Sequence, residues 1–215
     1  MGLKEIVSEL LTGGLVTLEV ATGAWAVSVT FGLLLAMLRE VGVPGMRWPA
    51  LVTTTALRSV PQLVVLYILY FGLGAVGINV PPLLAAIVGL GITDGAFSAE
   101  YYRASLLTVS ASQRDAGYSV GLSRVATFRR VVMPQAVPYM VPPWLNSFVG
   151  LLKTATLASA VGVPEILYDG SNIIDQTGKI VYVMVIIILI YVVVTMPLAR
   201  FVGILESRRR TTVGT

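Results

Sequence analysis

Several ionisable side chains lie inside long apolar stretches of this sequence, where burying a charge in lipid is costly. Asp94 lies in GLGITDGAFSAE, Glu100 ends that stretch, and Lys153 lies in another apolar stretch further on. Opposite charges, together with hydroxyl and amide groups, can bind a zwitterionic solute without covalent chemistry. The candidate residues for such a solute pathway are Asp94, Glu100, Asn146, Lys153, Thr154, Thr156 and Ser159.

The same charges also have structural interpretations. With 3.6 residues per helical turn, Asp94 and Glu100 lie roughly 120° apart around a helix, so they need not share a face. We expect Glu100 to pair with Arg103 in a structural ion pair. Lys153 can either face the pathway or form a fixed ion pair with Asp94. Asp94 is therefore the preferred pathway residue.

Some kinds of chemistry are excluded by composition. The sequence contains no Cys and no His, which excludes thiol and imidazole catalysis, disulfides and most zinc sites. It also lacks the phosphate-binding loop G-x-x-x-x-G-K. We therefore expect no catalytic residues, no metal site and no cofactor in this chain, and no hydrolysis of ATP by it.

The composition indicates an integral membrane protein. Of the 215 residues, 56% are hydrophobic and only 12% are charged, whereas soluble domains carry about 25% charged residues. Crossing the hydrocarbon core takes roughly 20 residues of helix, and five apolar stretches of that length fill most of the chain. We expect an all-α membrane protein with one transmembrane domain over 1–215 and spans at about 13–38, 51–76, 83–107, 137–161 and 180–205.

The arginines predict the orientation of these spans. All of them lie in or beside the loop after the first span, the polar segment 108–136, or the C-terminal tail. Five spans put these three regions on one face, which the positive-inside rule assigns to the cytoplasm. We expect the N-terminus outside and the C-terminus inside. The sequence pI of ≈ 9.5 then reflects this bias and not nucleic-acid binding.

The polar segment 108–136 is longer than a simple reversal of the chain requires. Residues from Ser110 to Gly121 are expected to form a short helix, which Gly121 ends because glycine tolerates the left-handed conformation. Apolar residues that include Phe128 give one side to a second helix. We therefore expect a helix, a turn and a helix across the cytoplasmic face, presenting a docking surface to a cytosolic partner.

Part of this segment resembles a known motif. DAGYSVGLS, from Asp115 to Ser123, followed by the pair Met133 and Pro134, is similar to the EAA motif of permease subunits of bacterial ABC importers. Asp115 stands where the motif has glutamate, and Gly117 stands where it has its second alanine. Both residues suit a docking helix, and a small residue such as Gly117 is expected to let the helix backbone approach a partner closely.

The resemblance extends beyond the motif, from about Gly14 to the end of the fifth span. RSVPQLVVLYILYFGL at 58–73, SAEYYRASL at 98–106 and LLKTATLASAVGVPEIL at 151–167 are similar to segments of the polar amino-acid uptake permeases. The resemblance implies a cytoplasmic coupling helix between the third and fourth spans, which seats in a groove of an ATPase subunit. The implied coupling residues are Arg114, Asp115, Ala116, Gly117, Tyr118, Gly121, Leu122 and Ser123.

The resemblance also implies partners and a location. These are two ATP-binding subunits that hold ATP and Mg, a second permease chain that is identical or paralogous, an extracytoplasmic solute-binding protein, and the lipid of a bacterial inner membrane. Related permeases often carry an acid where this chain has Thr154. Thr154 removes one possible anion beside the path, which counts against a strongly cationic solute. The same architecture carrying an opine, a compatible solute or a small peptide stays open, as does a membrane scaffold that recruits a partner without transport.

Overall fold

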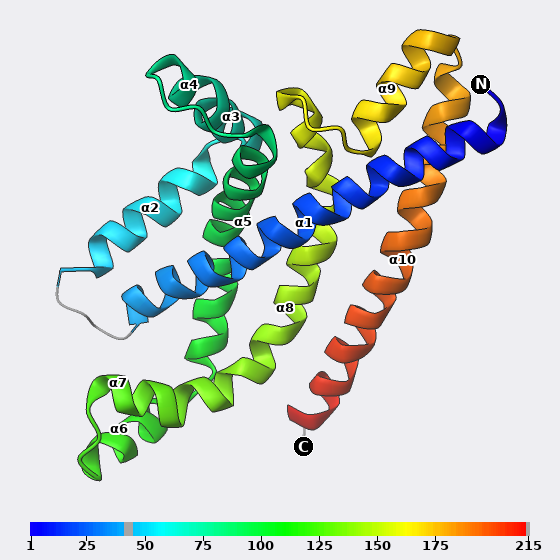
Figure 1. Cartoon of the computed structure of the whole chain (residues 1–215). Coiled ribbons are helices and arrows are strands. Elements are labelled where there is room, and N and C mark those ends of the chain that lie inside the picture. The colour runs from blue at the N-terminus through cyan, green and yellow to red at the C-terminus, as the bar shows by residue number, and fades with distance from the viewer. Residues whose placement is uncertain (41–44, 214–215) are drawn as a thin grey trace.

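The computed structural model describes residues 1–40 and 45–213, with side chains placed up to residue 205. The described residues form helices joined by short connections (Figure 1), which confirms the predicted all-α fold. The α-helices are α1 Leu3–Glu40, α2 Arg47–Ser59, α3 Gln62–Tyr67, α4 Leu73–Ala75, α5 Pro82–Leu107, α6 Ala111–Ser119, α7 Arg124–Thr127, α8 Met133–Thr154, α9 Ile166–Thr177 and α10 Ile180–Val213. Ile68–Gly72 and Phe128–Val132 are π-helical, and Ala155–Val161 is a 3₁₀-helix.

Within the described residues, three helices are individually long and apolar enough to cross a bilayer. These are α1, α5 and the part of α10 up to Leu205. Two bent pairs give up to five crossings if each pair counts as one span. Arg47–Ser59 meets Gln62–Ala75 at 104°, and Arg124–Val161 meets Ile166–Thr177 at 54°. The chain is a multi-pass membrane protein, and five is the upper count of spans by this criterion.

The predicted second span, 51–76, is interrupted at Pro61. Val60 and Pro61 both have extended backbone, with ψ angles of 134° and 137°. Proline lacks an N–H and disfavours a helical conformation in the residue before it. The pair therefore ends α2 at Ser59 and redirects the chain into α3.

Helices α1 and α5 pack closely through small residues. Ser28 and Gly32 of α1 lie one turn apart and face α5, where Gly95 lies. A Cβ added at Gly32 would lie 2.6 Å from the carbonyl oxygen of Gly95, and one added at Gly95 would lie 3.1 Å from that of Ser28. Small residues at this spacing let two helix backbones approach each other in a membrane. The close contact holds Ser28 against the middle of α5, beside Asp94.

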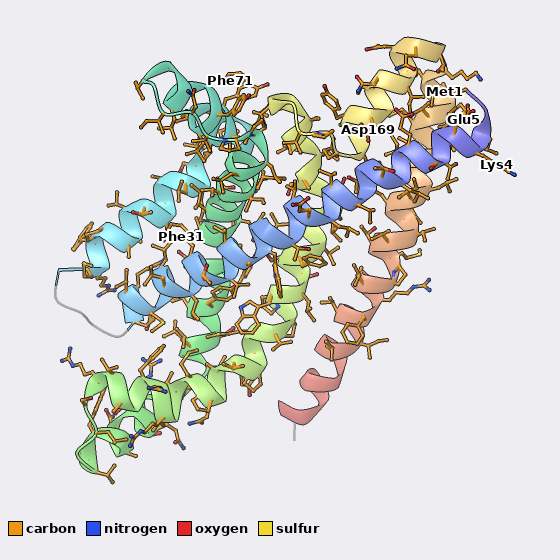
Figure 2. All side chains as sticks on the ribbon, in the orientation of Figure 1. Met1, Lys4, Glu5, Phe31, Phe71 and Asp169 are labelled. Atoms are coloured by element: carbon orange, nitrogen blue, oxygen red, sulfur yellow. The ribbon has the colours of Figure 1, made fainter. Side chains whose placement is uncertain are left out.

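Residues between the predicted fourth and fifth spans contain a helix, α9, that the sequence did not predict. The fully buried Glu165 caps it, accepting hydrogen bonds of 2.9 Å from the backbone N–H groups of Leu167 and Tyr168. Its other oxygen accepts a hydrogen bond of 3.4 Å from Thr17 Oγ1 of α1. Figure 2 shows Asp169 of α9 near the N-terminal part of α1. The chain beyond the fourth span thus packs back onto the first helix.

The two ends of the molecule carry different helices and different chain termini. In Figure 1 the N-terminus lies toward the same end as α4 and α9, whereas α6, α7 and the C-terminus lie toward the other. Among the arginines expected at that second end, Arg208, Arg209 and Arg210 belong to α10 but lie outside the described side chains. The helical segment after α5 and the tail thus lie toward the same end, as the predicted topology requires.

Candidate functional site

A cavity of ≈ 530 Å³ lies beside the middle of α5, where this helix faces α8. Two predicted pathway residues, Asp94 and Asn146, line it. Side chains three or four residues apart share one face of a helix, which brings Phe97 and Tyr101 of α5 onto the same wall. The lining residues are Asp94, Phe97, Ser98, Tyr101, Pro143, Asn146, Ser147 and Gly150.

Serine hydroxyls on three helices hold the carboxylate of Asp94. Its Oδ2 atom accepts hydrogen bonds of 2.5 Å from Ser28 Oγ of α1 and from Ser147 Oγ of α8. It also accepts a longer one, of 3.4 Å, from Ser98 Oγ of α5. Hydroxyl donors stabilise a carboxylate and fix its direction without cancelling its charge. The cavity therefore contains a carboxyl group whose direction is set by these hydroxyl groups.

Sequence reasoning missed these serines. Ser98 lies one turn after Asp94, so its spacing was a usable signal. Ser28 and Ser147 lie far from Asp94 in the chain and meet it only because α1, α5 and α8 pack together. The small residues that bring α1 against α5 recur every four residues and were the only hint of this contact in the sequence.

Glu100 lies in a cluster of ion pairs outside the cavity lining. Its Oε1 atom lies 2.6 Å from Arg39 Nη1 and 3.5 Å from Arg58 Nη1, and its Oε2 atom lies 3.2 Å from Arg103 Nε. The predicted pair with Arg103 is confirmed. These pairs join the ends of α1, α2 and α5, so Glu100 ties helices together.

The remaining predicted pathway residues lie at the end of α8 and in the 3₁₀-helix that follows. Lys153 is exposed in the last turn of α8, where a cation suits the helix dipole. Among the described ion pairs, none joins Lys153 to Asp94, so this alternative is not observed. The hydroxyls of Thr154, Thr156 and Ser159 donate to backbone carbonyls of the preceding turn. These residues do not join the group around Asp94.

Helices α6 and α7 form the predicted helical hairpin in the polar segment. Asp115, Ala116 and Tyr118 are exposed on α6. Gly121 lies in the turn with φ of 82°, a left-handed conformation that favours glycine. Leu122 is half-buried, and Ser123 Oγ accepts a hydrogen bond of 3.2 Å from Ala126 N to cap α7.

Gly117 differs from its neighbours on α6 because it is buried against α7. A Cβ added there would lie 2.7 Å from Thr127 Cγ2. The small size of residue 117 is therefore required inside this chain, where it lets α6 and α7 touch. The sequence had suggested instead that this glycine allows close approach to a partner.

Arg114 anchors α6 to the membrane helices. Its Nη2 atom donates a hydrogen bond of 2.8 Å to the carbonyl oxygen of Leu106 in α5, and its Nη1 atom lies 3.9 Å from Glu40 Oε2 at the end of α1. Glu40 also lies 3.6 Å from Arg103 Nη1. The hairpin is thus connected by charged groups to the ends of α1 and α5.

A bundle of membrane helices with a cavity that contains a carboxyl group, and with an exposed helical hairpin at one end, has the architecture of a transport permease. Residues 28–211 match the family described as binding-protein-dependent transport system inner membrane component. Because the match covers most of the chain, the chain belongs to this family.

Individual relatives agree with this assignment. The probable amino-acid ABC transporter permease protein YckA of Bacillus subtilis (strain 168) is 31% identical over 192 residues, which cover 89% of this chain and 85% of YckA. The octopine transport system permease protein OccM of Rhizobium meliloti is 32% identical over 94% of this chain and 88% of OccM. The crystal structure of an amino acid ABC transporter with histidines matches with a TM-score of 0.85 at 26% identity, over 97% of this chain and 99% of that one. The chain is a permease subunit of an ABC importer.

Proposed function

We propose that this chain translocates a polar amino acid that an extracytoplasmic solute-binding protein delivers. Such a solute carries an ammonium and a carboxylate and needs polar partners at membrane depth. The observation that carries the proposal is the oriented carboxylate of Asp94 in a cavity of ≈ 530 Å³, beside Ser147 and Asn146. The amino-acid transporter names of the relatives support the same substrate class.

In this proposal α6 is the coupling helix. The exposed residues Asp115, Ala116 and Tyr118 enter a groove of an ATP-binding subunit, while Gly121, Leu122 and Ser123 form the turn that sets the angle of α6. Arg114 passes the movement of α6 to α1 and α5. The hairpin and the C-terminus face the cytoplasm, and the N-terminus faces the outside.

The working unit contains two permease chains, identical or paralogous, and two ATP-binding subunits. ATP and Mg bind to those subunits, which hydrolyse the nucleotide. Closing of the ATP-binding pair moves the two coupling helices together and opens the cavities outward, where the binding protein releases its solute. Residues 1–215 act as one transmembrane domain and perform no covalent chemistry.

An opine is the second candidate solute. Octopine contains an amino-acid unit, and the relative OccM is named for its transport. A larger solute would use the same Asp94 cavity.

Reconstitution in proteoliposomes tests the proposal. The assembly contains this chain, its partner permease, the ATP-binding subunits and the binding protein. ATP-dependent uptake of labelled polar amino acids is the expected result. Preference for octopine would show that the solute is an opine. Uptake without ATP would indicate a secondary transporter. An intact assembly that transports nothing would favour a scaffold.

A further inference from the structure

A guanidinium group on a helix that contributes none of the cavity's lining residues contacts one of the residues that line it. Arg58, in the last turn of α2, places its Cζ atom 5.4 Å from the centroid of the Phe97 ring. Phe97 lines the cavity, three residues after Asp94 on α5. Three residues correspond to about 4.5 Å along a helix axis. Arg58 therefore contacts a residue that lies within one helical turn of Asp94.

The positive charge of Arg58 is only partly balanced by an ion pair within the chain. Its ion pair with Glu100 is 3.5 Å long and shares Oε1 with the shorter pair from Arg39, at 2.6 Å. The side chain of Arg58 is 41% exposed, against 11% for Arg39. The described ion pairs join four arginines to two glutamates, namely Arg39, Arg58, Arg103 and Arg114 with Glu40 and Glu100. This cluster has more arginines than glutamates, and Arg58 is its member that contacts the cavity-lining Phe97.

We propose that Arg58 binds the carboxylate of the translocated solute while Asp94 binds its ammonium group. The inference rests on the proposed function and assigns the two ends of the substrate. Phe97, which lines the cavity, holds the guanidinium of Arg58 beside it by a cation–π contact. A guanidinium can donate two parallel hydrogen bonds to a carboxylate. The ion pair of Arg58 with Glu100 is long, at 3.5 Å, and leaves the guanidinium able to bind the carboxylate of a solute. The two charges, one from α2 and one from α5, select solutes that carry both an ammonium and a carboxylate.

Thiol labelling in the cavity tests this without the selectivity of the binding protein. The chain has no cysteine, so Tyr101→Cys introduces a single reporter in the cavity wall, and Ser171→Cys on the exposed surface of α9 gives a matched control. The permease and ATP-binding subunits are placed in nanodiscs, and maleimide addition to the permease is followed by intact mass. The probes are a mixture of L-amino acids with uncharged polar side chains and the matching mixture of their α-amides, which lack the carboxylate.

With Arg58 present, the amino acids should slow labelling at Tyr101→Cys. The amides should slow it only at concentrations roughly tenfold higher, because they cannot form the charged hydrogen bond with Arg58. Arg58→Gln should remove this preference by weakening protection by the acids alone, and Arg58→Lys should keep part of it. Labelling at Ser171→Cys should not respond.

Equal protection by acids and amides with Arg58 present would overturn the inference, as would an unchanged preference in Arg58→Gln. A purely structural role of Arg58 would weaken protection by both mixtures to the same extent and also counts against it. Failure of the complete assembly to take up amino acids would overturn the proposed function, and this inference with it. If the assembly takes up amino acids but amino acids and amides protect equally, only the role of Arg58 would be overturned and the proposed function would stand.

Discussion

Arg114 of α6 donates a hydrogen bond of 2.8 Å to the backbone carbonyl of Leu106 in the last turn of α5. The same guanidinium lies 3.9 Å from Glu40 at the end of α1. One side chain therefore connects the exposed hairpin to the two helices that hold Ser28 and Asp94. In the proposed function, this side chain transmits a displacement of α6 to these two helices.

Replacing Arg114 by alanine should uncouple the hairpin from the membrane helices. Loss of a hydrogen bond from a charged donor costs about 1.5–3 kcal/mol, and Glu40 loses one of its two arginines. Solute-stimulated ATP hydrolysis by the reconstituted assembly should fall severalfold. Arg129→Ala, at an exposed position of the same polar segment, is the control. Normal stimulation in Arg114→Ala would contradict the route described.

The contact between Gly117 and Thr127 predicts that a substitution at one residue can be compensated by a substitution at the other. Gly117→Ala places a Cβ 2.7 Å from Thr127 Cγ2, and overpacking of this kind costs about 1–3 kcal/mol. Transport should decline in Gly117→Ala and recover when Thr127→Ala is added, because the second change removes the clashing methyl group. A decline that Thr127→Ala fails to relieve would mean that residue 117 acts on a partner instead.

The packing of α1 against α5 is expected to tolerate no added methyl group at Gly32. Its Cβ would lie 2.6 Å from the carbonyl oxygen of Gly95, whereas a Cβ at Gly203 of α10 meets nothing within 4 Å. Gly32→Ala should lower the midpoint of thermal unfolding in detergent, and Gly203→Ala should leave it unchanged or raise it, since alanine favours helix by about 1 kcal/mol. Similar midpoints for the two variants would show that the helices are not in close contact.

Asp94→Asn should reduce amino-acid uptake by an order of magnitude or more, because loss of a charged partner costs about 1.5–3 kcal/mol. Ser147→Ala should cause a smaller loss, since Asp94 keeps its other hydroxyl donors. Asp175→Asn, on the exposed surface of α9, provides the control. Uptake by Asp94→Asn at the rate of the unaltered chain would remove Asp94 from the pathway.

The sequence predicted those features that depend on local patterns. Long apolar stretches predicted a helical membrane protein, and Gly121 predicted the end of α6 because few other residues adopt a left-handed conformation. The acid in the apolar stretch of α5 pointed to Asp94, since an isolated charge in lipid requires partners.

Features that depend on packing between distant segments were not predicted from the sequence. Ser28 and Ser147 reach Asp94 from helices far away in the chain, and no local pattern marks either serine as its partner. Glu165 lies between the predicted fourth and fifth spans, and no local pattern indicates that its buried carboxylate caps α9 and contacts α1. Gly117 has the small size expected of a docking residue, but its neighbour is Thr127 of the same chain.

Cross-linking from single cysteines tests most directly whether α6 is the surface that meets the ATP-binding subunit. Ala116→Cys lies on the exposed side of α6, and Ser171→Cys lies on α9 toward the opposite end of the molecule. With a short thiol-to-amine cross-linker in the assembled complex, Ala116→Cys should join the permease to the ATP-binding subunit, and Ser171→Cys should not. Cross-linking of that subunit through Ser171→Cys and not through Ala116→Cys would contradict the account.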